Sequence, residues 1–148
     1  EEGDIIMADI DMTAKKAVTL TKMFDRGTMS MVNNGNNPYW YVNDLDVTGN
    51  RFRGARYQLS KSFVYGINNG IVRSTYDFYD MSKNITDETT IATSAAITVY
   101  DTSRRGDAVV KGTVSDIKAY ESVGDNCSVM VSFANYGAIK RIFIYNSK

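Results

Sequence analysis

The sequence predicts an all-β protein: an antiparallel β-sandwich or β-barrel of about 8–10 short strands, with little helix. Apolar and polar residues alternate with a period of two along several segments, Asn and Gly interrupt these segments, and sustained helical periodicity is missing. The composition agrees, because the ten Tyr favour strands and the eleven Gly and twelve Asn favour turns. A single Pro leaves turn formation to Asn and Gly.

The clearest element is a β-hairpin formed by residues 55–65 and 71–81. Residues of its first strand alternate, and one side carries an apolar stripe made of Tyr57, Leu59, Phe63 and Tyr65. We expect this stripe to pack in the core. Asn68, Asn69 and Gly70 separate the strands, and Asn-Gly tolerates the positive φ that tight hairpin turns require. The amides of Asn68 and Asn69 should therefore meet a neighbour or solvent at the hairpin tip.

The first third of the chain contains one ambiguous segment. Residues 4–12 alternate, with Ile6, Ala8, Ile10 and Met12 on one side and Asp9 and Asp11 on the other. Residues 13–25 fit either a short helix capped by Thr13 or a strand, and the β-rich residues 18–21 favour the strand. Further strands are expected at 28–32 and 39–47, on either side of a projecting loop at 33–38.

The last third is regular. Strands are expected at 91–100, 108–120, 127–134 and 138–145, and the polar segment 82–89 is expected to be a loop or a single helical turn. Gly112 lies inside one of these strands and predicts a bulge or bend there. The 148 residues suit one β domain over 1–148, with a weak subdivision near 82–90 as the alternative.

The charge balance does not favour nucleic acid or an anionic membrane as a partner. Seventeen basic and seventeen acidic residues give a formal net charge of zero. No apolar run approaches the roughly 18–20 residues that span a bilayer as a helix. A net charge near zero also removes one protection against association between copies.

Missing residue types exclude several kinds of chemistry. Without histidine, Ser-His-Asp catalysis, Cys-His catalysis and histidine-based zinc sites cannot be built. Cys127 is the only cysteine, so an intrachain disulfide is impossible, and we expect this side chain to be a small buried apolar group. Phosphate-binding glycine motifs and the GxSxG motif do not occur. We therefore expect a protein that is not an enzyme and holds no cofactor or metal.

Carboxylate pairs leave two weaker alternatives. Asp9 with Asp11, and Asp44 with Asp46, have the i, i+2 spacing on a strand that could flank a glycosidic bond. The solvated face of a half-buried strand is the favoured interpretation. Asp44, Asp46 and Asn50 also resemble a calcium loop, although the full EF-hand spacing is missing.

Two polar and aromatic segments are candidate contact or ligand surfaces. The first combines amides with aromatic rings, as sugar-binding surfaces do, and consists of Asn36, Asn37, Tyr39, Trp40 and Tyr41. Core packing or a subunit contact is the favoured interpretation for this segment, and glycan binding is the alternative. The second is the basic cluster around Arg51 and Arg53, which suits a solvated surface or a salt bridge to another subunit better than a phosphate track.

In composition and strand rhythm, this chain resembles virion structural proteins of tailed bacteriophages, of the head decoration or tail type. The resemblance extends over the whole chain but rests on no motif. It implies a structural protein of the virion that assembles with copies of itself or with other particle subunits, and whose N-terminus is processed. Residues 1–12 and the loop 33–38 are the candidate contact segments. The alternatives are a carbohydrate-binding or adhesive β-sandwich at a cell surface and, ranked lower, a carboxylate-based glycan hydrolase.

Overall fold

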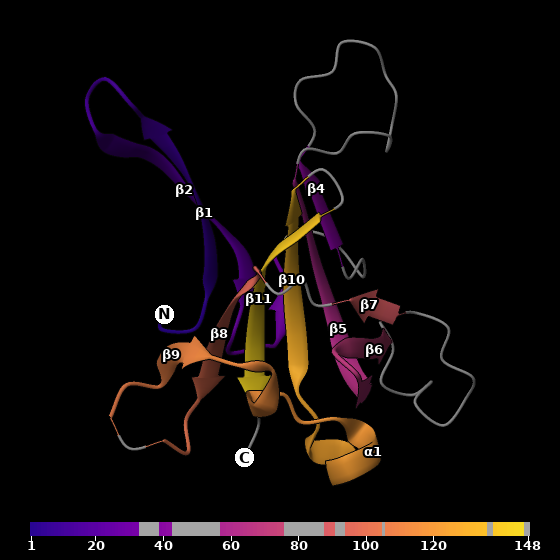
Figure 1. Cartoon of the computed structure of the whole chain (residues 1–148). Coiled ribbons are helices and arrows are strands. Elements are labelled where there is room, and N and C mark those ends of the chain that lie inside the picture. The colour runs from indigo at the N-terminus through magenta and orange to yellow at the C-terminus, as the bar shows by residue number, and fades with distance from the viewer. Residues whose placement is uncertain are drawn as a thin grey trace.

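The computed structural model describes residues 1–32, 39–42, 57–75, 88–90, 94–104, 106–135 and 138–146. At 9 and 57, in 39–42 and in 88–90 only the backbone path is described. The described residues form an all-β sandwich-like fold with two sheets and short helical turns, as the sequence predicts. Figure 1 shows the arrangement of the strands.

The smaller sheet has three antiparallel strands in the order β1-β2-β3. They are β1 (Ile5–Asp11), β2 (Lys16–Asp25) and β3 (Ser30–Met31). The strand interpretation of residues 13–25 is therefore confirmed for most of that segment. A four-residue turn, 12–15, joins β1 to β2, and Lys15 in this turn has a φ of 51°.

The larger sheet has eight strands in the order β7-β6-β5-β10-β11-β8-β9, and β4 pairs with β5 outside this path. The strands are β4 (Tyr39–Val42), β5 (Tyr57–Asn68), β6 (Ile71–Thr75), β7 (Glu88–Thr90), β8 (Ala96–Asp101), β9 (Val109–Gly112), β10 (Val129–Asn135) and β11 (Ala138–Asn146). The described sheets are open, so the barrel alternative is wrong. The β8–β11 pair is parallel, which corrects the expectation of a purely antiparallel sheet.

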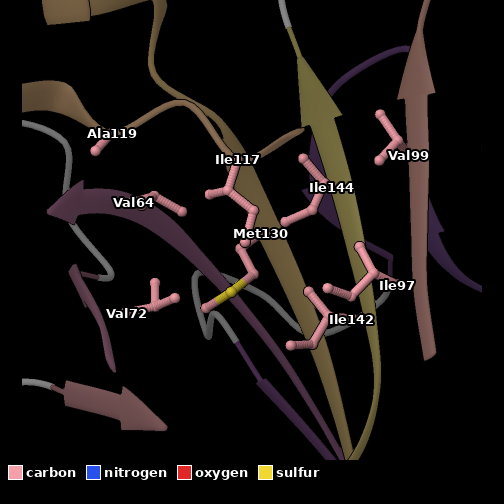
Figure 2. Packing of buried hydrophobic residues seen from close by; sticks show 9 residues of the cluster. All are labelled: Val64, Val72, Ile97, Val99, Ile117, Ala119, Met130, Ile142 and Ile144. Carbon is pink, nitrogen blue, oxygen red and sulfur yellow. The ribbon is translucent and has the colours of Figure 1, made fainter. Parts of the chain in front are cut away.

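Both faces of the larger sheet are covered. One face carries a core cluster beneath the connection from β9 to β10, and Figure 2 shows its members: Val64, Val72, Ile97, Val99, Ile117, Ala119, Met130, Ile142 and Ile144. That connection contains the 3₁₀ turns η2 (Val114–Asp116) and η3 (Gly124–Asn126) and the helix α1 (Tyr120–Val123). The opposite face packs against the smaller sheet through Met23, Phe24, Met31, Leu59, Val129, Val131 and Tyr145.

Because both faces of the sheet are covered, side chains on both sides of β5 are buried, whereas the sequence predicted one buried side. Leu59 is buried and Phe63 packs against its cluster, as predicted. Ser60 and Ser62, on the other side of the strand, are buried as well, because that side of the sheet is also covered. Tyr65 departs from the predicted stripe. The β5–β6 register shifts between Val64 and Gly66, and the Tyr65 ring stacks on Tyr120 of α1 at 6.0 Å.

The expected strand 108–120 is wrong after Gly112. A Cβ atom at Gly112 would overlap Val99, so the close approach of β8 requires glycine there. The chain then bends into η2, where a carboxylate oxygen of Asp116 accepts a hydrogen bond from the Thr113 N–H at 2.7 Å. The Thr-x-x-Asp spacing is a helix-start signal. The β7 strand was also missed, because its polar residues suggested a loop.

Candidate functional site

The β1–β2 hairpin extends beyond the rest of the fold, and we call β1, β2 and their turn the arm. In Figure 1 its far end stands clear of the other labelled strands. The strands pair along their length, from Ile5 opposite Phe24 to Asp11 opposite Lys16. Only the near end packs on the larger sheet, through Ile5, Met7, Met23 and Phe24. The far half is therefore a two-stranded ribbon with solvent on both sides.

One side of the arm is apolar from Ile6 toward the tip, and Lys22, opposite Ile6, bounds it at the base. Alternation places Ile6, Ala8 and Ile10 on the same side of β1, and the register sets Leu20 opposite Ala8 and Ala17 opposite Ile10. We call these five residues the arm face. All five are exposed. The register shifts between Asp9 and Ile10, so Val18 is an extra residue of β2 beside the arm face and is exposed as well.

The exposure of these aliphatic side chains is large. Ile10 is 59% exposed and Leu20 is 66% exposed. Eight large hydrophobic residues are exposed in the part of the chain that the structure describes. Five of them belong to the arm: Ile6, Ile10, Met12, Val18 and Leu20. The other three are dispersed over β6, β9 and α1. The arm is therefore the place where exposed apolar surface is concentrated among the described residues.

Beyond Met7, the opposite side of the arm is polar. Thr21 and Thr19 alternate with the arm-face residues of β2, and Lys16 lies opposite Asp11. Asp11 also closes the turn, because its Oδ1 accepts hydrogen bonds from the backbone N–H groups of Thr13 and Ala14 at 2.8 and 2.9 Å. The arm is thus amphipathic, and its apolar side points away from the side that packs on the body.

A buried carboxylate fixes the base of the arm. Asp4 precedes β1, and its side chain is 1% exposed. One oxygen lies 2.7 Å from Lys22 Nζ and 2.8 Å from the N-terminal ammonium, and the other accepts the Arg26 backbone N–H at 2.9 Å. The hydrogen bond from Lys22, followed by those from the ammonium and Arg26, holds the pKa of Asp4 far below its usual range.

Aromatic contacts join this base to the larger sheet. The buried Tyr145 hydroxyl donates a hydrogen bond to the Gly3 carbonyl oxygen at 2.7 Å, and the Tyr145 ring lies 4.8 Å from that of Phe24. Burial, together with the nearby Asp4 charge, raises the pKa of Tyr145, so its hydroxyl stays a proton donor. The Arg26 guanidinium lies 5.2 Å from the centre of the Tyr100 ring. These contacts orient the arm relative to the body.

A second surface feature is an open groove of about 490 Å³ beside the β5–β6 turn, and we call it the tip groove. Its lining residues are Ile67, Asn68, Asn69, Ile71, Arg73 and Glu121. Asn69 and Gly70 have φ angles of 50° and 77°, as a tight hairpin turn requires. The predicted hairpin tip is therefore confirmed, and its two amides are exposed along the groove.

An ion pair crosses β5 next to the tip groove. Arg73 Nη2 lies 2.7 Å from Glu121 Oε1, and the guanidinium lies 5.0 Å from the centre of the Tyr65 ring. A Cβ atom at Gly66 would stand 2.5 Å from Glu121 Oε2, so the missing side chain leaves space for this pair. The tip groove thus offers two amides, one neutralised ion pair and two aliphatic side chains.

The structure tests only some of the predicted site residues. Asn68 and Asn69 come together in the tip groove. Tyr39, Trp40 and Tyr41 form β4, and only their backbone pairing with β5 is described. Asn36, Asn37, Arg51 and Arg53 lie outside the described residues, as do Asp44, Asp46 and Asn50. Sequence reasoning included residues 1–12 among the contact segments but missed Val18 and Leu20, although their alternation with threonines was a visible signal.

Burial shifts the pKa of two further groups, Cys127 and Lys61. Cys127 is buried as predicted, and this burial raises the pKa of its thiol, which disfavours the nucleophilic thiolate. Burial also lowers the pKa of the half-buried Lys61. Within the described ranges, no three carboxylate or thiol groups gather as metal ligands would. Among those same residues, no helix is long and apolar enough to cross a membrane.

Comparison with known proteins adds no relative: no family model, no curated protein and no solved structure matches this chain.

Proposed function

We propose that this chain is a non-enzymatic structural protein that self-assembles or decorates a larger particle, with the arm as its main contact element. The compositional resemblance to bacteriophage virion proteins suggests the class of particle, a capsid or tail. Under this proposal the partners are copies of the chain or other particle subunits. The function then consists of binding these partners through surface that becomes buried in the contact.

The exposure of the arm face is the observation that carries this proposal. Exposed apolar patches on folded proteins mark contact sites, because burying apolar surface gains about 25 cal/mol per Å². A two-stranded ribbon without a third strand or a packing partner is only marginally stable in water. Ile10 and Leu20 lie on such a ribbon and face solvent. A partner that covers them would bury this apolar surface and would stabilise the ribbon.

The anchoring of the arm base supports the same proposal. Asp4 binds both Lys22 and the Arg26 backbone, and Tyr145 binds the backbone at Gly3, so the arm leaves the body in a defined direction. A pre-oriented contact element loses less conformational freedom on binding than a free tail does. The formal net charge of zero also leaves no long-range repulsion between copies.

Light scattering of the purified chain over a wide concentration series, with electron microscopy of the most concentrated sample, tests the proposal. We expect the weight-average mass to rise above the 16.5 kDa of one chain as concentration increases. A mass that stays at 16.5 kDa throughout would contradict self-assembly.

The tip groove favours a second candidate function, glycan binding. Amides such as Asn68 and Asn69 and the charged pair of Arg73 and Glu121 can exchange hydrogen bonds with sugar hydroxyls, and about 490 Å³ suits a small ligand. A glycan array probed with the wild type and with Asn68→Ala tests this candidate. Specific retention that the substitution weakens would support it, and no retention on a broad panel would exclude it.

A further inference from the structure

We propose that the arm face of one copy packs face to face on the arm face of a second copy, related by a two-fold axis, with the tip of each arm over the base of the other. This inference rests on the proposed assembly function and names the partner of the same surface.

The arm face matches a second arm face better than it matches the described surface of the body. An apolar face gains free energy only against another apolar surface. The large hydrophobic residues exposed on the described body are Ile71, Val109 and Val123, and they belong to three different elements. None of these makes a continuous stripe. A second arm does, because Ile6, Ile10 and Leu20 form one apolar stretch, which ends at the base where Lys22 lies opposite Ile6.

The arm face is accessible to the arm of a second copy. At the base, Ile5 and Met7 point toward the larger sheet and pack against its core cluster. Ile6 and Ala8 alternate with them and so point the opposite way, away from the body of their own copy. Two arms can therefore approach through these faces without either body standing between them.

The charges at the two ends of the arm favour one relative direction of the two arms. The turn at the tip carries Lys15 beyond Lys16, which lies opposite Asp11, and the base carries the exposed Glu2 and Glu1, the latter 3.3 Å from Arg26. With the tip of one arm over the base of the other, lysines lie near glutamates on both sides of the axis. With tip over tip, the lysines of the two copies would repel each other. A two-fold contact of this kind uses the same residues of both copies.

The size of the contact sets its strength. The seven residues of β1 extend about 23 Å at about 3.3 Å per residue, and two strands are about 10 Å wide. Such a face is well below the roughly 800 Å² that each partner contributes to a standard stable interface. One pair of arms therefore gives a weak dimer, and a particle in which each subunit makes several contacts would gain strength through multivalency.

Cysteine cross-linking of the full chain tests the arrangement. Ala8 lies at the centre of the arm face, near the proposed axis, so Ala8→Cys brings two equivalent thiols together, and Leu20→Cys reports the same contact. Thr19→Cys is the matched control, because Thr19 is exposed on the opposite side of the arm. The native Cys127 is buried and provides the background. Mild oxidation followed by non-reducing electrophoresis gives the yield of cross-linked dimer.

We expect Ala8→Cys and Leu20→Cys to form dimers several times faster than Thr19→Cys or the wild type, and Ile10→Asn to slow the reaction of Ala8→Cys. Equal rates at Ala8→Cys and Thr19→Cys, in a chain whose mass still rises with concentration, would overturn the arm-to-arm contact and leave the assembly function standing. A chain that neither associates nor cross-links would overturn both.

Discussion

The carboxylate of Asp4 joins the start of β1 to the end of β2. It accepts hydrogen bonds from Lys22 at 2.7 Å, in β2, and from the Arg26 backbone, just after β2, although its own side chain is almost fully buried. A buried carboxylate with several donors is stabilised in its ionised form, which explains why the pKa of Asp4 is lowered. Its ionisation is therefore coupled to folding.

The stability of the protein should depend on the ionisation of Asp4. Because the pKa of Asp4 is lower in the folded state, its contribution is complete above the ordinary aspartate pKa of about 4 and is lost as pH falls toward the folded-state pKa. Asp4→Asn should lower the free energy of unfolding by about 1–2 kcal/mol at neutral pH and flatten its decline below about pH 4. Urea unfolding across this pH range measures both effects.

Asp107→Asn is the control for this prediction, because Asp107 is exposed. We expect it to leave the neutral-pH stability within about 0.5 kcal/mol of the wild type. An Asp4→Asn variant with the wild-type pH profile would show that Asp4 does not hold the arm base.

Turn residues were the part of the structure that the sequence predicted best. Asn69 and Gly70 have the positive φ angles that an Asn-Gly turn requires, and this requirement is local. The bend after Gly112 was anticipated only as a bulge or bend. Its cause is partly non-local, since it depends on the approach of Val99 from β8, which a sequence pattern cannot reveal.

At the scale of elements, the arm shows what periodicity predicts and what it leaves open. The alternation in residues 4–12 correctly predicts β1, and the β-rich segment 18–21 correctly predicts β2. Alternation usually indicates a half-buried strand, yet here the apolar side is the exposed one. A pattern identifies two unlike sides of a strand, but only the packing of other elements decides which side is covered.

The far half of the arm should be less protected in an isolated copy than in an associated one. Amides that bond between β1 and β2 over residues 8–20 should exchange with deuterium faster than those between β10 and β11, because a lone ribbon opens easily. Their exchange should slow as protein concentration rises. Hydrogen exchange measured at several concentrations checks this expectation, with the β10–β11 amides as the internal reference. Arm protection that does not change with concentration would contradict a contact at this element.

At the scale of the molecule, the fold class could be predicted and the sheet order could not. Short alternating strands with Asn and Gly turns indicate an all-β protein, and the described residues form one. The pairing of β8 with β11 in parallel, and the burial of both sides of β5, depend on contacts between segments far apart in the chain. The expected core stripe was therefore correct at Leu59 and incomplete, because Ser60 and Ser62 are buried too.

The larger sheet already has both faces covered, so the described residues leave little apolar surface exposed except on the arm. Two core clusters account for the buried side chains of β5, β10 and β11. The arm face lies outside both clusters. This contrast between a covered body and an uncovered arm is the reason why we propose an assembly function.

Sedimentation velocity of the wild type beside the double variant Ile10→Asn, Leu20→Asn is the most direct test of that conclusion. Ile71→Asn is the matched control, since Ile71 is also an exposed isoleucine at 38% but lies away from the arm. We predict that the wild type and Ile71→Asn associate as concentration rises, whereas the double variant remains folded and sediments as a monomer. Equal association of all three proteins, or a wild type that stays monomeric at every concentration, would contradict the account.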